Sequence, residues 1–316
     1  MRRKKNFVFT LVLIIIFLVS GCQKIMPVDA PITDVYTTIF PFYAITQRIL
    51  DGNNAYRVHC LIQPQDGCIR SYALSDWDLY TLGYDADIVI AGGQNLESDI
   101  TSLESAAETD FILMEALEGI DLKDFTTDEI FSTESHFYGK NPHIYLSISG
   151  AKKVLGVISA MLCAIDFDNS AEIESQSEQA NDELNIVAQF IFDASTATQG
   201  KRAAILNECC FYPAEDMNLD IVAVYLRESG EVLNEDMIQK CVAELISNKT
   251  EIALIEQQAP IELIDALESN GIQVAKINTL STYTTGGWQY LLDILTDNAQ
   301  SIVNAANRIN ETEIQN

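Results

Sequence analysis

The chain has 316 residues, and its 46 acidic residues outnumber its 19 lysines and arginines, which gives a net charge of −27. A chain this acidic repels the phosphates of nucleic acids, so we exclude a nucleic-acid-binding protein. Hydrophobic residues make up 48% of the chain, and this content together with the length predicts two full-sized domains.

The N-terminus predicts an exported protein. The first five residues contain four positive charges, and an apolar run follows over residues 7–19. That run is too short to cross about 30 Å of hydrocarbon comfortably, and its flanks are those of a secretory signal. Residues 18–22, Leu-Val-Ser-Gly-Cys, resemble the bacterial lipobox. The resemblance implies a signal peptide over residues 1–21, lipidation of Cys22 and a tether over residues 22–33. An uncleaved anchor or plain secretion is the alternative.

Strands and helices are expected to alternate from residue 34 onward. We expect strands over residues 34–40, 56–62, 87–91 and 110–114. We expect helices over residues 42–50, 75–84, 101–108 and 150–165, the second of them capped by Ser75. Residues 117–140 are acidic and lack periodicity, which indicates irregular structure.

A long helix is predicted over residues 170–194, after which the alternation restarts. The later strands are expected over residues 202–206, 221–226, 252–255 and 273–277. The later helices are expected over residues 235–246, 260–269 and 288–307. This alternation is typical of an α/β fold with mostly parallel sheets flanked by helices.

The expected architecture is two lobes joined by one long backbone helix, with a ligand cleft between the lobes. The N-terminal lobe is predicted over residues 34–168, the connecting helix over 169–199 and the C-terminal lobe over 200–316. In open α/β sheets ligands bind beyond the carboxyl ends of the strands, so the loops after the strands should carry the function.

One motif carries most of the functional argument. Residues 141–147, Asn-Pro-His-Ile-Tyr-Leu-Ser, hold one of only three histidines in the chain, just before a predicted helix. The lipobox, the two lobes, the long helix and this motif together resemble the zinc/manganese-binding lipoproteins of metal ABC transporters. The resemblance covers nearly the whole mature chain, and residues 34–49 resemble that family's first strand and helix.

The resemblance implies a metal site of four side chains between the lobes. It assigns two of these positions to His143 and, in the motif Ile-Leu-Asn-Glu-Cys-Cys-Phe, to Glu208, and a glutamate there resembles the manganese-type members. The third position, a histidine in the family, holds Arg70 here. The fourth, an aspartate in the family, holds Asn278. Arginine stays protonated and cannot donate a lone pair, and its charge would repel a cation by roughly 4 kcal/mol per unit charge at 4 Å.

Three interpretations of this altered site stay open. In the first, a rebuilt shell binds zinc or manganese with help from Cys68, Cys209, Cys210 or His136, and a thiolate would favour zinc. In the second, Arg70 occupies the place of the metal and pairs with Glu208 through a charge-assisted bond. In the third, the same arginine recruits a small anionic ligand.

Two further polar side chains lie in predicted strands, and only Glu256 is a possible accessory group. Glu256 ends a predicted strand at the expected cleft, where it would accept hydrogen bonds or act as a charge on the rim. His59 lies within a predicted strand and is interpreted as a packed strand residue.

The resemblance implies a binding protein and not an enzyme. It would lie outside the cytoplasm, be lipid-anchored to the bacterial cell membrane, and capture Zn²⁺ or Mn²⁺, zinc more readily than manganese. Its partners would be an ABC permease and the ATPase of that permease. The chain has no Gly-rich phosphate loop after a strand, no GxSxG and no HExxH. A surface adhesin-like lipoprotein on the same scaffold is the alternative from another class.

Overall fold

The computed structural model describes residues 32–61, 74–94, 96–97, 100–107, 111–125, 139–226, 233–280 and 286–315. Residues 33–316 form one compact unit, and the description below concerns this unit. The predicted signal peptide, the lipidation of Cys22 and most of the predicted tether lie outside the described residues. The predicted limits of the two lobes stay predictions.

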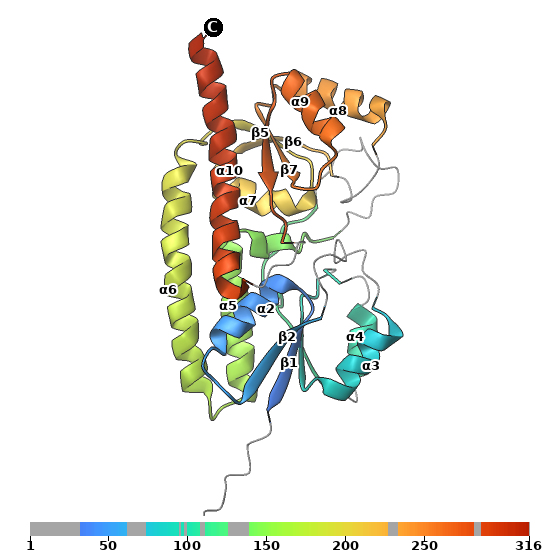
Figure 1. Ribbon diagram of the computed structural model, residues 1–316, viewed down its shortest axis with the longest axis vertical. Coiled ribbons are helices and arrows are strands. Elements are labelled where there is room, and N and C mark those ends of the chain that lie inside the picture. Colours follow the sequence, from blue (N-terminus) through green and yellow to red (C-terminus); the bar gives the residue numbers. More distant parts are fainter. Residues whose placement is uncertain are drawn as a thin grey trace, which may run out of the picture. The chain divides into compact units, whose positions relative to one another are not determined.

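The first sheet has four parallel strands in the order β2-β1-β3-β4 (Figure 1). Its strands are β1 Thr33–Thr37, β2 Tyr56–Cys60, β3 Ile88–Ala91 and β4 Ile112–Glu115. The helices among them are α2 Phe40–Ile49, α3 Asp76–Asp85 and α4 Ile100–Ala107. The four predicted strands and three predicted helices are confirmed, with ends that differ by a few residues. Ser75 caps α3 as predicted, in a capping box with Asp78.

The second sheet repeats the same topology, with four parallel strands in the order β6-β5-β7-β8. Its strands are β5 Arg202–Ile205, β6 Asp220–Val224, β7 Ile252–Glu256 and β8 Gln273–Ile277. Its predicted helices are confirmed as α8 Glu235–Ser247, α9 Ile261–Ser269 and α10 Gly287–Gln315. Two short elements of this half were not predicted: the 3-10 helix η4 over Glu208–Cys210, and α7 over Phe211–Asp216.

Along the chain, three helices lie between β4 and β5: the 3-10 helix η3 (His143–Leu146), α5 (Ile148–Ile165) and α6 (Ser170–Ser195). By length and composition alone α5 could cross a membrane. Its apolar face is buried in the protein core through Ala151, Val154, Leu155, Ile158 and Leu162. We therefore interpret α5 as a core helix.

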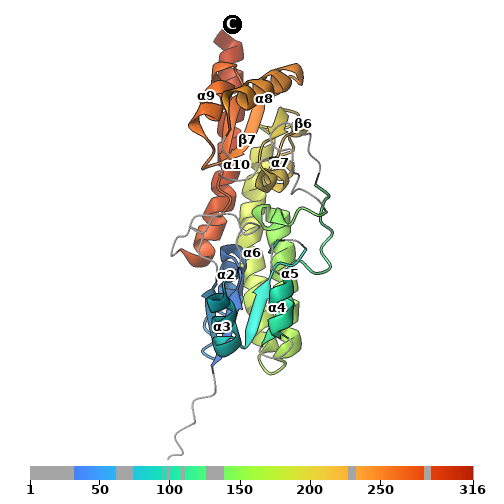
Figure 2. The ribbon, with the colours of Figure 1, turned by 90° about the vertical axis from the view of Figure 1, so that its right-hand side faces the viewer.

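Two long helices run along both sheets, whereas the sequence predicts only one helix that connects the lobes. Helix α6 connects the halves as expected, and α10 packs beside it (Figures 1 and 2). Although α10 follows the second sheet in the chain, it also contacts α2. There Tyr290 packs edge-on against Phe40 with ring centroids 5.7 Å apart. An apolar stripe indicates which face of a helix is buried, but not which distant element covers it, so this second connection was not predicted.

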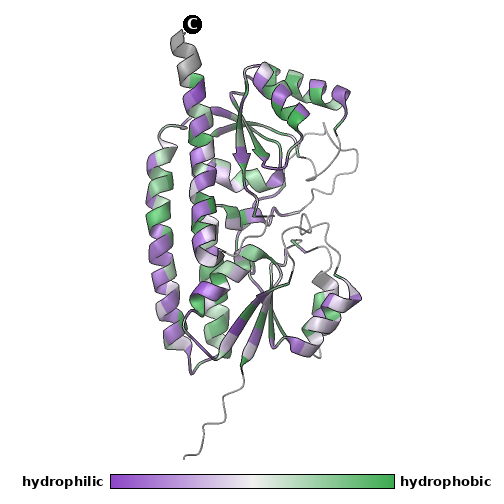
Figure 3. Cartoon of the chain, in the orientation of Figure 1, coloured by the Kyte–Doolittle hydropathy of each residue, from purple (hydrophilic) through white to green (hydrophobic). Residues whose placement is uncertain are grey.

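Each sheet buries one face in a shared core and the other in a core of its own. Along β5, Ala203 and Ile205 belong to the shared core. Ala204 and Leu206 point the other way, toward α8 and α9. The same alternation divides β3, because successive side chains of a strand point to opposite faces. In Figure 3 the strands β1 and β2 carry both hydrophilic and hydrophobic residues. The shared core contains residues of both sheets, so it ties the two halves together.

Asp216, at the end of α7, helps to fix the start of α5. Its Oδ2 accepts a hydrogen bond from the Ile148 N–H at 2.7 Å, where it faces the positive end of the α5 dipole. Burial raises the pKa of Asp216 from 3.8 to about 6, the hydrogen bond from Ile148 lowers it, and the charge of Glu215 raises it. The native carboxyl therefore keeps its proton up to a higher pH than the unfolded one.

This shift predicts how replacement of Asp216 changes stability with pH. The contribution of Asp216 is present in full below about pH 4 and is lost as the pH rises through about 6, because only the native state holds the proton in that range. Relative to the wild type, the unfolding free energy of Asp216→Asn should therefore rise between pH 4 and pH 7 by up to about 3 kcal/mol. Urea denaturation of both proteins at the two pH values measures their unfolding free energies. If the difference in unfolding free energy between the two proteins did not change with pH, the prediction would be wrong.

Candidate metal site

His143 is the first residue of η3 and is only 1% exposed. Ser147 follows η3 as the N-cap of α5, and its Oγ accepts the Gly150 N–H at 3.0 Å. The Tyr145 ring packs against the imidazole in an edge-on arrangement, with ring centroids 6.1 Å apart. The helix start and the tyrosine hold the histidine in a single buried position.

Asn141 determines which nitrogen of the His143 ring carries the proton. The Asn141 Nδ2 donates to the backbone oxygen of Glu208 at 3.0 Å, and its Oδ1 accepts the His143 N–H at 3.0 Å. These bonds establish Oδ1 as the acceptor, and this oxygen also lies 3.0 Å from His143 Nδ1. The Nδ1 atom therefore donates its hydrogen, and Nε2 carries the ring's lone pair. An outer partner of this kind orients metal-binding histidines in proteins.

Asn141 is itself held from both halves of the unit. Its backbone N–H donates to the Lys123 oxygen at 2.7 Å. Its backbone oxygen accepts the hydroxyl of Tyr212, from α7, at 2.8 Å. The same hydroxyl accepts the Lys123 N–H at 3.1 Å. Sequence reasoning missed Asn141 and Tyr212 as positioning residues, although Asn141 lies within the histidine motif.

Glu208 and Cys209 reach the site from the loop after β5. Asn207 is the N-cap of η4, and its Oδ1 accepts the Cys209 N–H at 3.0 Å. The short turn brings the two side chains close to η3, which contacts η4. Glu208 is 1% exposed and Cys209 is 6% exposed.

The three side chains form one donor group. Single ligand atoms of His143, Glu208 and Cys209 all lie within 4.8 Å of one another, and all three residues are buried. Imidazole nitrogen, carboxylate oxygen and cysteine sulfur are the ligands that zinc accepts in proteins. Distances of this size suit donors around one shared ion, so the residues present fit a bound divalent metal.

Comparison with known proteins agrees with this geometry. Residues 35–305 match the family model described as zinc-uptake complex component A, periplasmic. The chain belongs to this ZnuA family. The chain is thus a solute-binding protein of metal uptake, from a family that functions outside the cytoplasm. The family is one of substrate-binding proteins.

Individual relatives are distant in sequence. The high-affinity zinc uptake system protein ZnuA of Bacillus subtilis (strain 168) is 21% identical over 254 residues, 78% of this chain and 78% of that protein. Zn(II)-bound AdcA from Streptococcus pneumoniae aligns over 87% of this chain with a TM-score of 0.71 and 16% identity, but the chain covers only 58% of AdcA. FpvC from Pseudomonas aeruginosa, in complex with Mn²⁺, has a TM-score of 0.72 and 18% identity over 87% of this chain and 99% of FpvC.

These structures confirm the predicted two-lobe α/β fold. At such identities they show the fold alone, and the roles of single residues have to be argued from this chain.

Two ligand positions, Arg70 and Asn278, depart from the pattern of the ZnuA family, and the structure describes only the second of them. Arg70 lies outside the described residues, and so do the possible accessory ligands Cys68 and His136. The proposed pair between Arg70 and Glu208 therefore stays a prediction. Asn278 is described, directly after β8, and it is 6% exposed.

The described contacts of Asn278 give it a role in a turn. Its Oδ1 accepts the Leu280 N–H at 2.9 Å, and Leu280 has a positive φ of 60°. Its Nδ2 donates to the Tyr290 hydroxyl at 3.4 Å. Its backbone exchanges two hydrogen bonds with the side chain of Asn298, at 2.8 and 3.0 Å. A metal-ligand role for Asn278 stays a prediction, and the amide is already used to anchor the loop after β8 on α10.

Glu256 and His59 do not join the donor group. Glu256 is fully buried at the carboxyl end of β7, but it is not among the residues whose donor atoms lie within 4.8 Å of one another. His59 is in β2, stacked on Tyr36, and its Nε2 lies 2.8 Å from an oxygen of Asp34. It has the packed strand position that was predicted for it.

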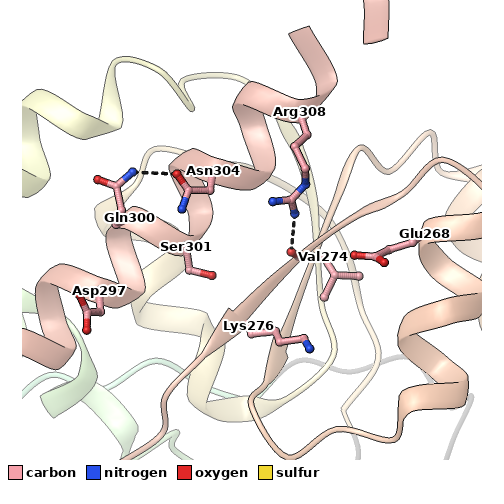
Figure 4. A pocket seen from close by; sticks show the side chains of 8 residues that line it. All are labelled: Glu268, Val274, Lys276, Asp297, Gln300, Ser301, Asn304 and Arg308. Carbon is pink, nitrogen blue, oxygen red and sulfur yellow. Dashed lines mark hydrogen bonds between the residues drawn. The ribbon is translucent and has the colours of Figure 1, made fainter. Parts of the chain in front are cut away.

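A surface hollow of about 610 Å³ shares no lining residue with this site (Figure 4). It is lined by residues of α9, β8 and α10: Glu268, Val274, Lys276, Asp297, Gln300, Ser301, Asn304 and Arg308. The Arg308 guanidinium is engaged there, because it donates to the Val274 oxygen at 2.9 Å and to the Gln273 side chain at 2.7 Å. We assign this hollow no part in metal binding.

Proposed function

We propose that this chain captures a divalent transition metal, zinc in preference to manganese, and delivers it to an ABC permease driven by an ATPase. The protein would be held on the outer side of the bacterial membrane by a lipid on Cys22. The observation that carries the proposal is the buried group of His143, Glu208 and Cys209, whose donor atoms lie within 4.8 Å of one another.

The electrostatics of this group favour a cation. Transferring a carboxylate such as that of Glu208 from water into a buried position is costly, and a bound cation offsets that cost. His143 adds a neutral imidazole whose lone pair is on Nε2, because Asn141 accepts the hydrogen of Nδ1. Nε2 is therefore the nitrogen with which His143 would bind the ion.

Capture would involve only small movements of the two halves. The two sheets share one core, and α10 contacts elements of both halves. Hinge closure would have to break these packed contacts, whereas short loops such as that after β5 can adjust without doing so. The scaffold thus supports a binding site that is largely preformed and opens locally.

The test is metal content and metal titration of the purified protein. After removal of bound metal by a chelator, zinc should bind in an equimolar amount and more tightly than manganese in calorimetric titrations. A protein that is purified without metal and stays inert to both ions would overturn the proposal. That outcome would favour the alternatives, a site closed by Arg70 and Glu208, a small anionic ligand, or an adhesin.

A further inference from the structure

Cys209 occupies a special place in the candidate site. It follows Glu208 directly in the chain, and the Asn207 side chain holds its backbone N–H in the first turn of η4. Its sulfur lies within 4.8 Å of the donor atoms of His143 and Glu208. Glu208 and Cys209 therefore reach the same donor group from adjacent positions of η4.

The next residue, Cys210, provides an internal comparison. Both residues are buried, and both belong to the shared apolar core. Among the described residues, however, only the sulfur of Cys209 joins the donor group of His143. The sequence Cys-Cys alone gives no means of distinguishing the two, but the fold separates them.

We propose that Cys209 binds the metal ion as a thiolate, as a third ligand beside His143 and Glu208. This inference rests on the proposed function and specifies the chemistry of the same site. On binding, the Cys209 thiol releases its proton to solvent, and a sulfur–metal bond forms. No electron is transferred, so no oxidant or reductant is needed.

The charges of the site favour this assignment. A divalent cation with a neutral imidazole and one carboxylate carries a net charge of +1, and burying a net charge is costly. The thiolate of Cys209 brings the net charge to zero. A tetrahedral zinc ion with three protein ligands keeps a fourth position open, and that position allows ligand exchange when the ion is handed on.

The thiolate also sets the selectivity of the site. Soft sulfur ligands favour zinc, whereas manganese prefers carboxylate, carbonyl and water oxygens. With one nitrogen, one oxygen and one sulfur donor, the site should therefore discriminate against manganese. The substrate class that we infer is the zinc-like ions of borderline softness.

Cobalt(II) is a direct probe, because thiolate–cobalt bonds give an intense near-ultraviolet charge-transfer band that nitrogen and oxygen ligands do not give. When the metal-free wild-type protein is titrated with cobalt(II), we expect this band. We also expect the bands of tetrahedral cobalt(II) in the visible region. X-ray absorption of the zinc-loaded protein should show a sulfur neighbour at about 2.3 Å. Neither measurement depends on a variant that folds.

The matched variants are Cys209→Ser and Cys210→Ser. The charge-transfer band should disappear only in Cys209→Ser, and its zinc affinity should fall by more than about 10-fold, with little change in manganese affinity. Cys210→Ser should keep the band. Stoichiometric zinc binding by the wild type without a sulfur signal would overturn the role of Cys209 and leave the proposed function intact. A wild type that binds no metal would overturn both.

Discussion

Replacing His143 with alanine is expected to lower zinc affinity by more than about 100-fold. Loss of an outer partner of a metal ligand typically costs 10–100-fold, and loss of the ligand itself should cost more. The variant leaves the thiol and carboxylate of the site in place but removes the only imidazole of the donor group. Competition against a zinc-binding dye measures the change, and circular dichroism checks that the fold is retained.

His59→Ala is the matched control for this prediction. It removes a histidine of β2 whose Nε2 lies 2.8 Å from an oxygen of Asp34 in β1 and which does not belong to the donor group. Its zinc affinity should stay within about 2-fold of the wild type, because no zinc ligand is lost. Equal losses of affinity in the two variants would show that zinc binds elsewhere, and unchanged affinity in His143→Ala would remove His143 from the site.

Strands such as β3 could be predicted because they are short apolar runs buried on both faces, a pattern typical of parallel sheets. The helix α3 could be predicted with the help of its cap, Ser75, whose side chain accepts the Asp78 N–H. The 3-10 turn at Glu208 and the short helix after it escaped prediction, because elements of one turn have too few residues to show a period.

The candidate site was only partly predictable for a similar reason. His143 and Glu208 follow from local motifs, whereas the approach of the Cys209 sulfur to both depends on contacts between η3 and η4, which are about 65 residues apart. The tautomer of His143 depends on Asn141, which also bonds to the Glu208 backbone. Such convergence is a property of tertiary packing, and neither charge nor spacing along the chain indicates it.

Gly150 allows helix α5 to begin directly after the histidine motif. It lies in the first turn of α5, against η3. A Cβ atom built on Gly150 would lie 1.9 Å from the backbone oxygen of Ile144 and 2.4 Å from its Cγ1. The backbone oxygen cannot move aside as the end of a flexible side chain can. Only glycine therefore allows α5 to begin this close to the residue after His143.

We expect Gly150→Ala to lower the free energy of unfolding by at least about 3 kcal/mol, the upper end for overpacking of a core. Its melting temperature should fall by roughly 6–12 °C. Because the clash displaces Ile144, it should also move His143 and weaken zinc binding. Differential scanning calorimetry of the metal-free protein separates the loss of stability from the loss of zinc.

Gly156→Ala tests whether this effect comes from close approach and not from glycine itself. Gly156 lies in the same helix, is exposed, and would have no atom within 4 Å of a Cβ. Alanine there should raise stability by about 0.5–1 kcal/mol, because glycine loses more backbone entropy in a helix. Its zinc affinity should stay at the wild-type value, since nothing next to His143 moves. If the two variants changed stability by the same amount, the contact between α5 and η3 would not be what positions the histidine.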